Sequence, residues 1–144
     1  MNEFTFEDIQ SMGGCECSFK KKITESMEEK FREISGDLNP LHYDDEYAVQ
    51  ISKGKYKMHA TFGMLTASLY STLAGMYIPG KYSLIHSFEE LSFVKPVFVG
   101  DELEISGVVT DTDPSLKLIR VKAHIKNQEG KTMSRAKMKI IVMK

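Results

Sequence analysis

Residues 61–76 read Thr-Phe-Gly-Met-Leu-Thr-Ala-Ser-Leu-Tyr-Ser-Thr-Leu-Ala-Gly-Met, and this stretch decides the fold. Its larger apolar side chains recur every three or four positions, which is the period of a helix; they are Phe62, Leu65, Leu69, Leu73 and Met76. Most other positions hold Gly, Ala, Ser or Thr, and none is charged. Because a helix without a charged face has no side suited to water, we predict a helix that is buried on nearly all sides.

After Pro79 and Gly80 the apolar pattern changes to an alternation with a period of two. This alternation, broken by turns rich in Gly, Asp and Pro, predicts four strands at residues 82–93, 102–111, 116–127 and 131–143. Before the helix we expect a strand at residues 15–23, a helix at 27–34 and irregular chain at 35–56. One buried helix followed by an antiparallel meander predicts an α+β fold, in which a curved antiparallel sheet wraps a long central helix.

The overall composition narrows the class of protein. At 144 residues the chain has the size of one domain, so we expect a single domain over residues 1–144. Its 19 basic and 20 acidic residues give a net charge of -1, which provides no general attraction for nucleic acid or an anionic membrane. The first residues do not resemble a leader, and no later stretch is long and apolar enough to cross a bilayer. We therefore expect a cytoplasmic protein.

The cysteines and histidines do not predict a metal site. Cys15 and Cys17 are the only cysteines, and as alternate residues of a strand they point to the same face in a poor geometry for a disulfide. We expect both to be free thiols. His59, His86 and His124 are scattered without the spacing of metal ligands.

A carboxylate and an imidazole lie five residues apart within residues 31–42, Phe-Arg-Glu-Ile-Ser-Gly-Asp-Leu-Asn-Pro-Leu-His. Gly36 is suited to end the preceding helix, and Pro40 stiffens the turn that follows. Asp37 and His42 should therefore lie on irregular but rigid chain, where reacting groups are often placed. The same spacing also fits an ordinary turn, in which Asp37 caps the next turn and His42 leads into another helix.

The residues in this stretch carry more information than their spacing. The pattern Phe-x-x-x-Ser-Gly-Asp-x-Asn-Pro-Leu-His, with Ala48 six residues after the histidine, resembles the signature of the MaoC-like dehydratases and (R)-specific enoyl-CoA hydratases. Two later blocks continue the resemblance in family order: Gly-Met-Leu at residues 63–65 and Phe-x-x-Pro-Val-x-x-Gly-Asp at residues 93–101. The resemblance covers about residues 31–109 and implies the hot-dog fold, in which a curved sheet wraps a central helix.

The resemblance also implies an activity. It implies a hydro-lyase that adds water reversibly to trans-2-enoyl thioesters and forms (R)-3-hydroxyacyl thioesters. The acyl carrier would be coenzyme A or an acyl-carrier protein. Coenzyme A is then part of the substrate, so no separate cofactor and no metal are expected. Small residues on the central helix, followed by the bulky Tyr70, Met76 and Tyr77, favour a short acyl chain.

The resemblance assigns roles to particular residues. Hydration needs a base for water, an acid for the alpha carbon, and donors for the charge on the thioester oxygen. Asp37 and His42 are expected to supply the first two, with one water between them. The backbone N–H of Gly63 is expected to bind the oxygen, although this glycine also suits a tight helix entry. Asn39 and Ser71 are expected to support the pair through hydrogen bonds. The expected substrate contacts are Phe62, Met64, Phe93 and Pro96.

Family members usually pair through the strand after the central helix, so the resemblance implies a homodimer or a higher homo-oligomer. Pairing there would also remove an exposed sheet edge from each subunit. One feature of the sequence departs from the family, and another has two interpretations. Many members have a histidine directly before the helix glycine, whereas this chain has Phe62 there and has His59 three residues earlier, which we interpret as a partly exposed loop residue. Lys53, Lys55 and Lys57 suit either the phosphates of coenzyme A or a solvated loop.

Two other functions suit the same fold. One is an acyl-CoA thioesterase, in which a carboxylate near a helix N-terminus activates water against the carbonyl carbon. The other is a non-catalytic subunit that binds acyl-CoA. Asp37 and His42 argue against the second, because a binding subunit needs neither an acid nor a base.

Overall fold

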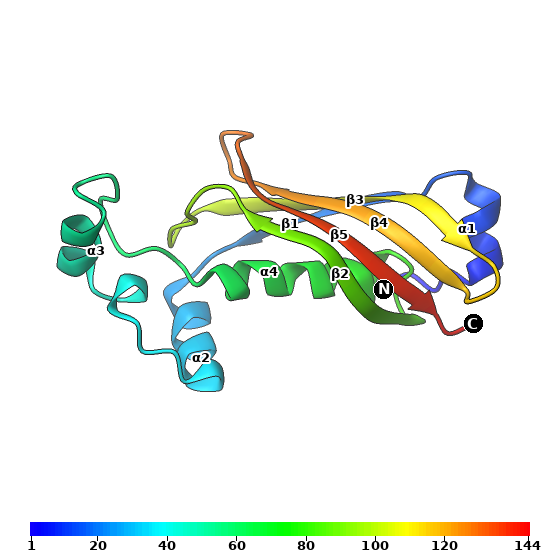
Figure 1. Ribbon diagram of the computed structural model, residues 1–144, viewed down its shortest axis with the longest axis horizontal. Helices are drawn as coiled ribbons and strands as arrows, with labels where there is room; N and C mark the ends of the chain where they lie inside the picture. Colours follow the sequence, from blue (N-terminus) through cyan, green and yellow to red (C-terminus); the bar gives the residue numbers. More distant parts are fainter.

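The computed structural model describes residues 1–144 and contains one curved antiparallel sheet (Figure 1). Its five strands are β1 (Glu16–Lys22), β2 (Ser83–Phe93), β3 (Glu102–Asp113), β4 (Leu118–Lys126) and β5 (Thr132–Val142), in the spatial order β1-β3-β4-β5-β2. Strands β3 to β5 form a meander, but the expectation that β2 begins it is wrong. The chain between β2 and β3 crosses the sheet, so β2 pairs with β5 and lies at one edge, while β1 pairs with β3 at the other.

The predicted central helix is confirmed. Helix α4 (Gly63–Thr72) and the π-helical turn that continues it (Leu73–Tyr77) lie along one face of the sheet (Figure 1). The alternating residues of the strands that face this helix are buried against it, as the period of two requires. Fully buried members of this core are Tyr70 and Leu73 from the helix and Ile105, Ile125, Met138 and Ile140 from the sheet. This arrangement is the expected hot-dog fold.

Three further helices lie at the two ends of the sheet. Helices α2 (Glu25–Ser35) and α3 (Asp45–Ile51) lie at the end where α4 begins, and α1 (Phe6–Met12) lies at the opposite end beside the C-terminus (Figure 1). None of these helices is both long and apolar enough to span a membrane. Cys15 and Cys17 are free thiols, as expected.

The expectation that residues 35–56 are irregular is wrong, because they contain α3 and a short 3-10 turn (Pro40–His42). Helix α3 begins where the side chain of Asp44 accepts a hydrogen bond of 2.9 Å from the backbone N–H of Tyr47. Only Ala48 of this helix is buried, so the apolar period that reveals a longer helix is missing. Helix α1 was not predicted for the same reason, because few of its residues are buried. It begins at the cap formed by Thr5.

The central helix packs tightly against the sheet at Gly107 of β3. A Cβ atom there would lie 2.7 Å from the Cδ2 atom of Leu73 and 3.0 Å from the Cγ1 atom of Val121. We expect Gly107→Ala to lower the free energy of unfolding by about 1–3 kcal/mol, because a packed core cannot absorb the methyl group without strain. Urea unfolding measures this change. Gly75→Ala is the matched control, since its nearest neighbour would be 3.9 Å away; an equal loss in both variants would contradict the packing argument.

Candidate active site

The turn after α2 holds Asp37 in one orientation. Gly36 ends the helix in the left-handed conformation, with φ of 69°, as its sequence position predicted. The Oδ1 atom of Asp37 then accepts a hydrogen bond of 3.0 Å from the backbone N–H of Asn39. The side chain of Asn39 accepts another of 3.0 Å from the backbone N–H of Leu41. These bonds leave the second oxygen of Asp37, Oδ2, available to other groups.

His42 faces that free oxygen. Its Nε2 atom lies 4.0 Å from Oδ2 of Asp37, a separation that one water molecule can bridge. Its Nδ1 atom lies 2.9 Å from the backbone oxygen of Ala60. Because a carbonyl oxygen only accepts hydrogen bonds, Nδ1 carries the proton, and Nε2 of the neutral ring has a free lone pair. The imidazole is therefore held in the tautomer that accepts a proton on the side of Asp37.

A cavity of about 310 Å³ opens next to His42. Four of the residues predicted for the site line its wall: His42, Gly63, Phe93 and Pro96. The remaining wall residues are Leu41, Tyr56, Ala60, Thr61, Thr66, Val94, Lys95, Val97 and Met133. Asp37 is not in the wall. With its side chain 45 % exposed against 16 % for His42, the carboxylate lies on the outer side of the imidazole.

Besides Asp37 and Asn39, three predicted residues lie outside the cavity. The ring of Phe62 is only 2 % exposed and packs behind His42, with ring centroids 4.3 Å apart, so it supports the imidazole and does not line the wall. Met64 is 58 % exposed and also absent from the wall. Ser71 is exposed on α4 and makes no hydrogen bond within the chain to Asp37 or His42. Within one chain, the structure does not bring Met64 or Ser71 to the pair.

Gly63 is the first residue of α4 and lies in the cavity wall. No side chain caps this end of the helix, so the backbone N–H groups of its first turn are not taken by a capping residue. A Cβ atom on Gly63 would lie 3.3 Å from the Cε1 atom of Phe93. The absence of a side chain therefore keeps both the Phe93 ring and the helix N-terminus accessible from the cavity. An anionic oxygen placed there would be stabilised by the N–H groups and the helix dipole.

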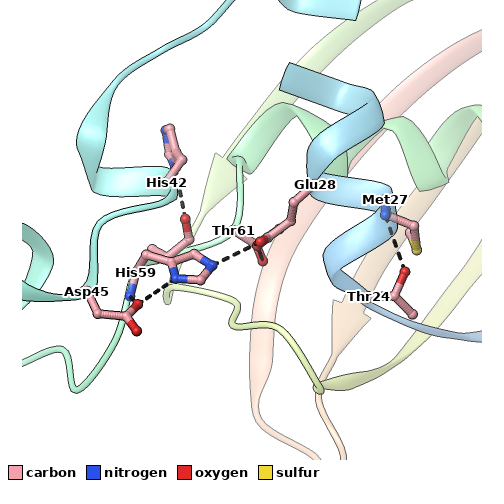
Figure 2. Close-up of polar contacts among 8 residues, drawn as sticks. Thr24, Met27, Glu28, His42, Asp45, His59 and Thr61 are labelled. Atoms are coloured by element: carbon pink, nitrogen blue, oxygen red, sulfur yellow. Dashed lines mark hydrogen bonds and ion pairs between the residues drawn. The ribbon is translucent and has the colours of Figure 1, made fainter. Parts of the chain in front are cut away.

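A second polar cluster lies behind the cavity, and sequence reasoning missed it. His59 lies between two carboxylates, with Nδ1 2.6 Å from Oδ1 of Asp45 and Nε2 2.9 Å from Oε2 of Glu28 (Figure 2). The other oxygen of Glu28 accepts a hydrogen bond of 2.6 Å from the hydroxyl of Thr61. Glu28 is 3 % exposed, which is unusual for a carboxylate. The sequence signal was a glutamate three residues before Phe31, on the apolar side of the predicted helix.

These contacts change the pKa values of the cluster. Burial is the largest single influence on the pKa of His59 and lowers it, but the hydrogen bonds and charges of Asp45 and Glu28 outweigh burial and raise the pKa above its ordinary value. The hydrogen bonds from the backbone and side chain of His59 lower the pKa of Asp45. His59 is a partly exposed loop residue, as the sequence suggested, but its side chain is only 14 % exposed and is bound on both sides by carboxylates, which the sequence did not reveal.

No group of three or more His, Cys, Asp or Glu side chains is arranged to hold a metal ion. The predicted lysine cluster is divided. Lys53 and Lys55 border a shallow hollow that shares Leu41 and Tyr56 with the cavity, whereas Lys57 is not part of it.

Comparisons with known proteins agree with the fold and identify the family. The model of the MaoC-like domain family matches residues 13–131. An (R)-specific enoyl-CoA hydratase of Aeromonas caviae is 45 % identical over 80 residues, which cover 56 % of this chain and 57 % of that protein, a little over half of its length. A 3-hydroxybutyryl-CoA dehydratase of Methylorubrum extorquens is 32 % identical over 116 residues, which cover 81 % of this chain and 70 % of that protein.

Among solved structures, the (R)-hydratase from A. caviae involved in PHA biosynthesis superposes with a TM-score of 0.81 at 30 % identity, covering 90 % of this chain and 95 % of that one. The family match includes the Asp37–His42 turn, the start of α4 and the segment of Phe93 and Pro96. The agreement in sequence and in fold shows that this chain belongs to the MaoC-like dehydratase family.

Proposed function

We propose that this protein is a hydro-lyase that adds water to trans-2-enoyl thioesters, forms (R)-3-hydroxyacyl thioesters, and catalyses the reverse dehydration. The observation that carries the proposal is the geometry at the cavity. The lone pair of His42 Nε2 and the free oxygen of Asp37 are 4.0 Å apart at one side, and the helix N-terminus at Gly63 lies in the cavity wall. The names of the relatives, an enoyl-CoA hydratase and a 3-hydroxybutyryl-CoA dehydratase, support the same reaction.

The proposed mechanism begins with one water held between Asp37 and His42. Its oxygen forms a bond to the beta carbon while the pair takes one of its protons. The electrons of the double bond move toward the thioester oxygen, where the N–H of Gly63 binds the developing negative charge. The pair then returns the proton to the alpha carbon on the same face, and the carbonyl re-forms. The balance is one water added, so the proposal needs no cofactor beyond the coenzyme A of the substrate and no metal.

The cavity supports a short acyl chain. Its volume of about 310 Å³ is at the small end of the range for ligand pockets. Lys95 in the wall and Lys53 and Lys55 beside it provide positive charge for the phosphates of a coenzyme A or acyl-carrier-protein thioester. A thioester is therefore the proposed partner, with no role for nucleic acid or a membrane. The cytoplasmic location stays a prediction.

A homodimer formed through β2 is part of the proposal. Strand β2 is a sheet edge that bears the exposed apolar side chains Leu84, Phe88 and Phe93. Pairing with a second copy would cover these side chains and satisfy the free backbone groups of the edge. Since Phe93 also lines the cavity, a partner there would close one side of the site. Sedimentation velocity measures the oligomeric state; a purely monomeric protein at micromolar concentration would contradict this part.

The proposed activity is tested with crotonyl-CoA. Loss of the enoyl-thioester absorbance without release of free thiol, with (R)-3-hydroxybutyryl-CoA as the product, is the expected result. Release of free thiol would instead identify a thioesterase. No change in either assay with short, long and branched enoyl chains would leave a binding subunit and would overturn the proposal.

A further inference from the structure

The Glu28 carboxylate forms hydrogen bonds to the residues on both sides of Ala60. One of its oxygens bonds the side chain of His59 and the other bonds the hydroxyl of Thr61, at 2.9 and 2.6 Å. Asp45 of α3 holds His59 from the other side, through both its ring Nδ1 and its backbone N–H, at 2.6 and 2.9 Å. Helices α2 and α3 are thus both tied to residues 59–61, the segment that leads into α4 (Figure 2).

Ala60, which lies between these two residues, orients His42. Its backbone N–H donates a hydrogen bond of 3.0 Å to the oxygen of Leu41. Its backbone oxygen is the group 2.9 Å from His42 Nδ1 that selects the tautomer of the ring. The peptide after Ala60 is also held by the backbone N–H of Thr61, which donates a hydrogen bond of 2.8 Å to the oxygen of Val97. If residues 59–61 shifted and this peptide rotated, Nδ1 would be released and the proton could move to Nε2, where it would block the base.

We propose that His59, held as an imidazolium between Glu28 and Asp45, is a positioning residue for the reaction, because it fixes the Ala60 carbonyl that keeps the Nε2 atom of His42 unprotonated. This inference rests on the proposed function. It goes beyond the family resemblance, which concerns Asp37, His42 and the helix glycine.

The arrangement of the partners requires the charged form of His59. Each ring nitrogen faces a carboxylate oxygen, and a carboxylate accepts hydrogen bonds, so both nitrogens must carry a proton. The charged groups that act on the ring are Glu28 of α2 and Asp45 of α3, both negative. Their net effect is the raised pKa of His59 described above.

The raised pKa of His59 sets the direction in which stability and activity change with pH. A histidine whose pKa is raised on folding contributes stability that is fully present below its ordinary pKa of 6.5 and is lost as the pH rises through the raised value. Above that value His59 has one N–H for two carboxylates, so one of its two side-chain contacts fails. Activity should therefore fall on the alkaline side, because the loss of a His59 contact leaves the Ala60 carbonyl less firmly positioned.

The first test compares His59→Gln with the wild-type enzyme in crotonyl-CoA hydration. We expect kcat to fall by about 10- to 100-fold with KM changed by less than about twofold, because the reacting group is misplaced while the substrate contacts remain. His124→Gln is the matched control, since His124 is a partly buried histidine bonded to Ser106 on the sheet, away from the cavity. A wild-type kcat in His59→Gln, or an equal loss in the control, would overturn the inference.

Asp45→Asn separates charge from shape. The amide oxygen can still accept from His59, but its negative charge is gone, so the pKa of His59 should fall and the alkaline limb of the kcat profile should move to lower pH. A purely structural contact would leave that limb in place, and this result would contradict the proposal. Because Asp45 is exposed, this variant remains informative if His59→Gln does not fold.

Long-range ¹H–¹⁵N NMR of the histidine rings provides a readout that does not need activity. In the wild type we expect neutral His42 to carry its proton on Nδ1 and His59 to carry protons on both nitrogens. In His59→Gln, His42 should show a mixture of tautomers; an unchanged His42 tautomer would overturn the inference. If the wild type has no hydratase activity, the proposed function fails, and the NMR result still decides whether His59 controls His42.

Discussion

Asp37→Asn and His42→Gln are each expected to lower kcat for crotonyl-CoA hydration by about 10²- to 10⁴-fold, the range for loss of a general acid or base. Asp37→Asn retains an oxygen that can accept from the N–H of Asn39, so the turn keeps its shape while the carboxylate is lost. His42→Gln removes the Nε2 lone pair that faces Asp37. Stopped-flow absorbance measures kcat of each variant, and circular dichroism shows whether the variant keeps its fold.

Asp44→Asn is the matched control for this pair. Asp44 lies two residues after His42, and its side chain likewise accepts a hydrogen bond from a backbone N–H, that of Tyr47, at 2.9 Å, but this bond caps α3. Asparagine is an equally good cap, so this variant should keep wild-type kcat. The double variant of Asp37 and His42 should be no slower than about the slower single variant, because the two residues act on one water as a unit. Additive losses would show that they act independently.

Gly63→Pro is expected to lower kcat by about 10²- to 10³-fold, the effect of removing one donor to a developing oxyanion. Proline lacks the N–H but is well tolerated at the first position of a helix. Phe62, which precedes it, has φ of -57° and ψ of 125°, an extended conformation suited to the residue before proline. The fold should therefore survive, and the free energy of unfolding should change little.

Gly63→Ala is the control for the added bulk. It retains the N–H and adds a Cβ atom 3.3 Å from the partly exposed ring of Phe93, which is free to shift. We expect a smaller loss of kcat, with the main effect on KM. If the alanine and proline variants lose equal activity, the role of Gly63 is to provide space, and the N–H does not bind the oxyanion.

Much of the fold was predictable because its signals are local. The uncharged apolar period of residues 61–76 predicted α4, and alternation predicted each strand of the later sheet within a few residues. The Asp37–His42 turn was predictable for the same reason, since Gly36 and Pro40 act on their own backbone. Helix α1 was not, and α3 was foreseen only in the alternative interpretation in which His42 leads into another helix. A short helix that buries only one or two side chains leaves no apolar period to detect.

The sequence by itself therefore determined the central helix, the strands, the family and the two residues of the proposed pair. Only the tertiary structure decided which edge β2 joins, which tautomer His42 adopts, and that Glu28, His59 and Asp45 form one cluster. The bonds of His59 join residues 31 and 14 positions apart in the chain. No local pattern encodes such contacts, because they exist only once α2, α3 and the start of α4 have packed together and removed the Glu28 carboxylate from water.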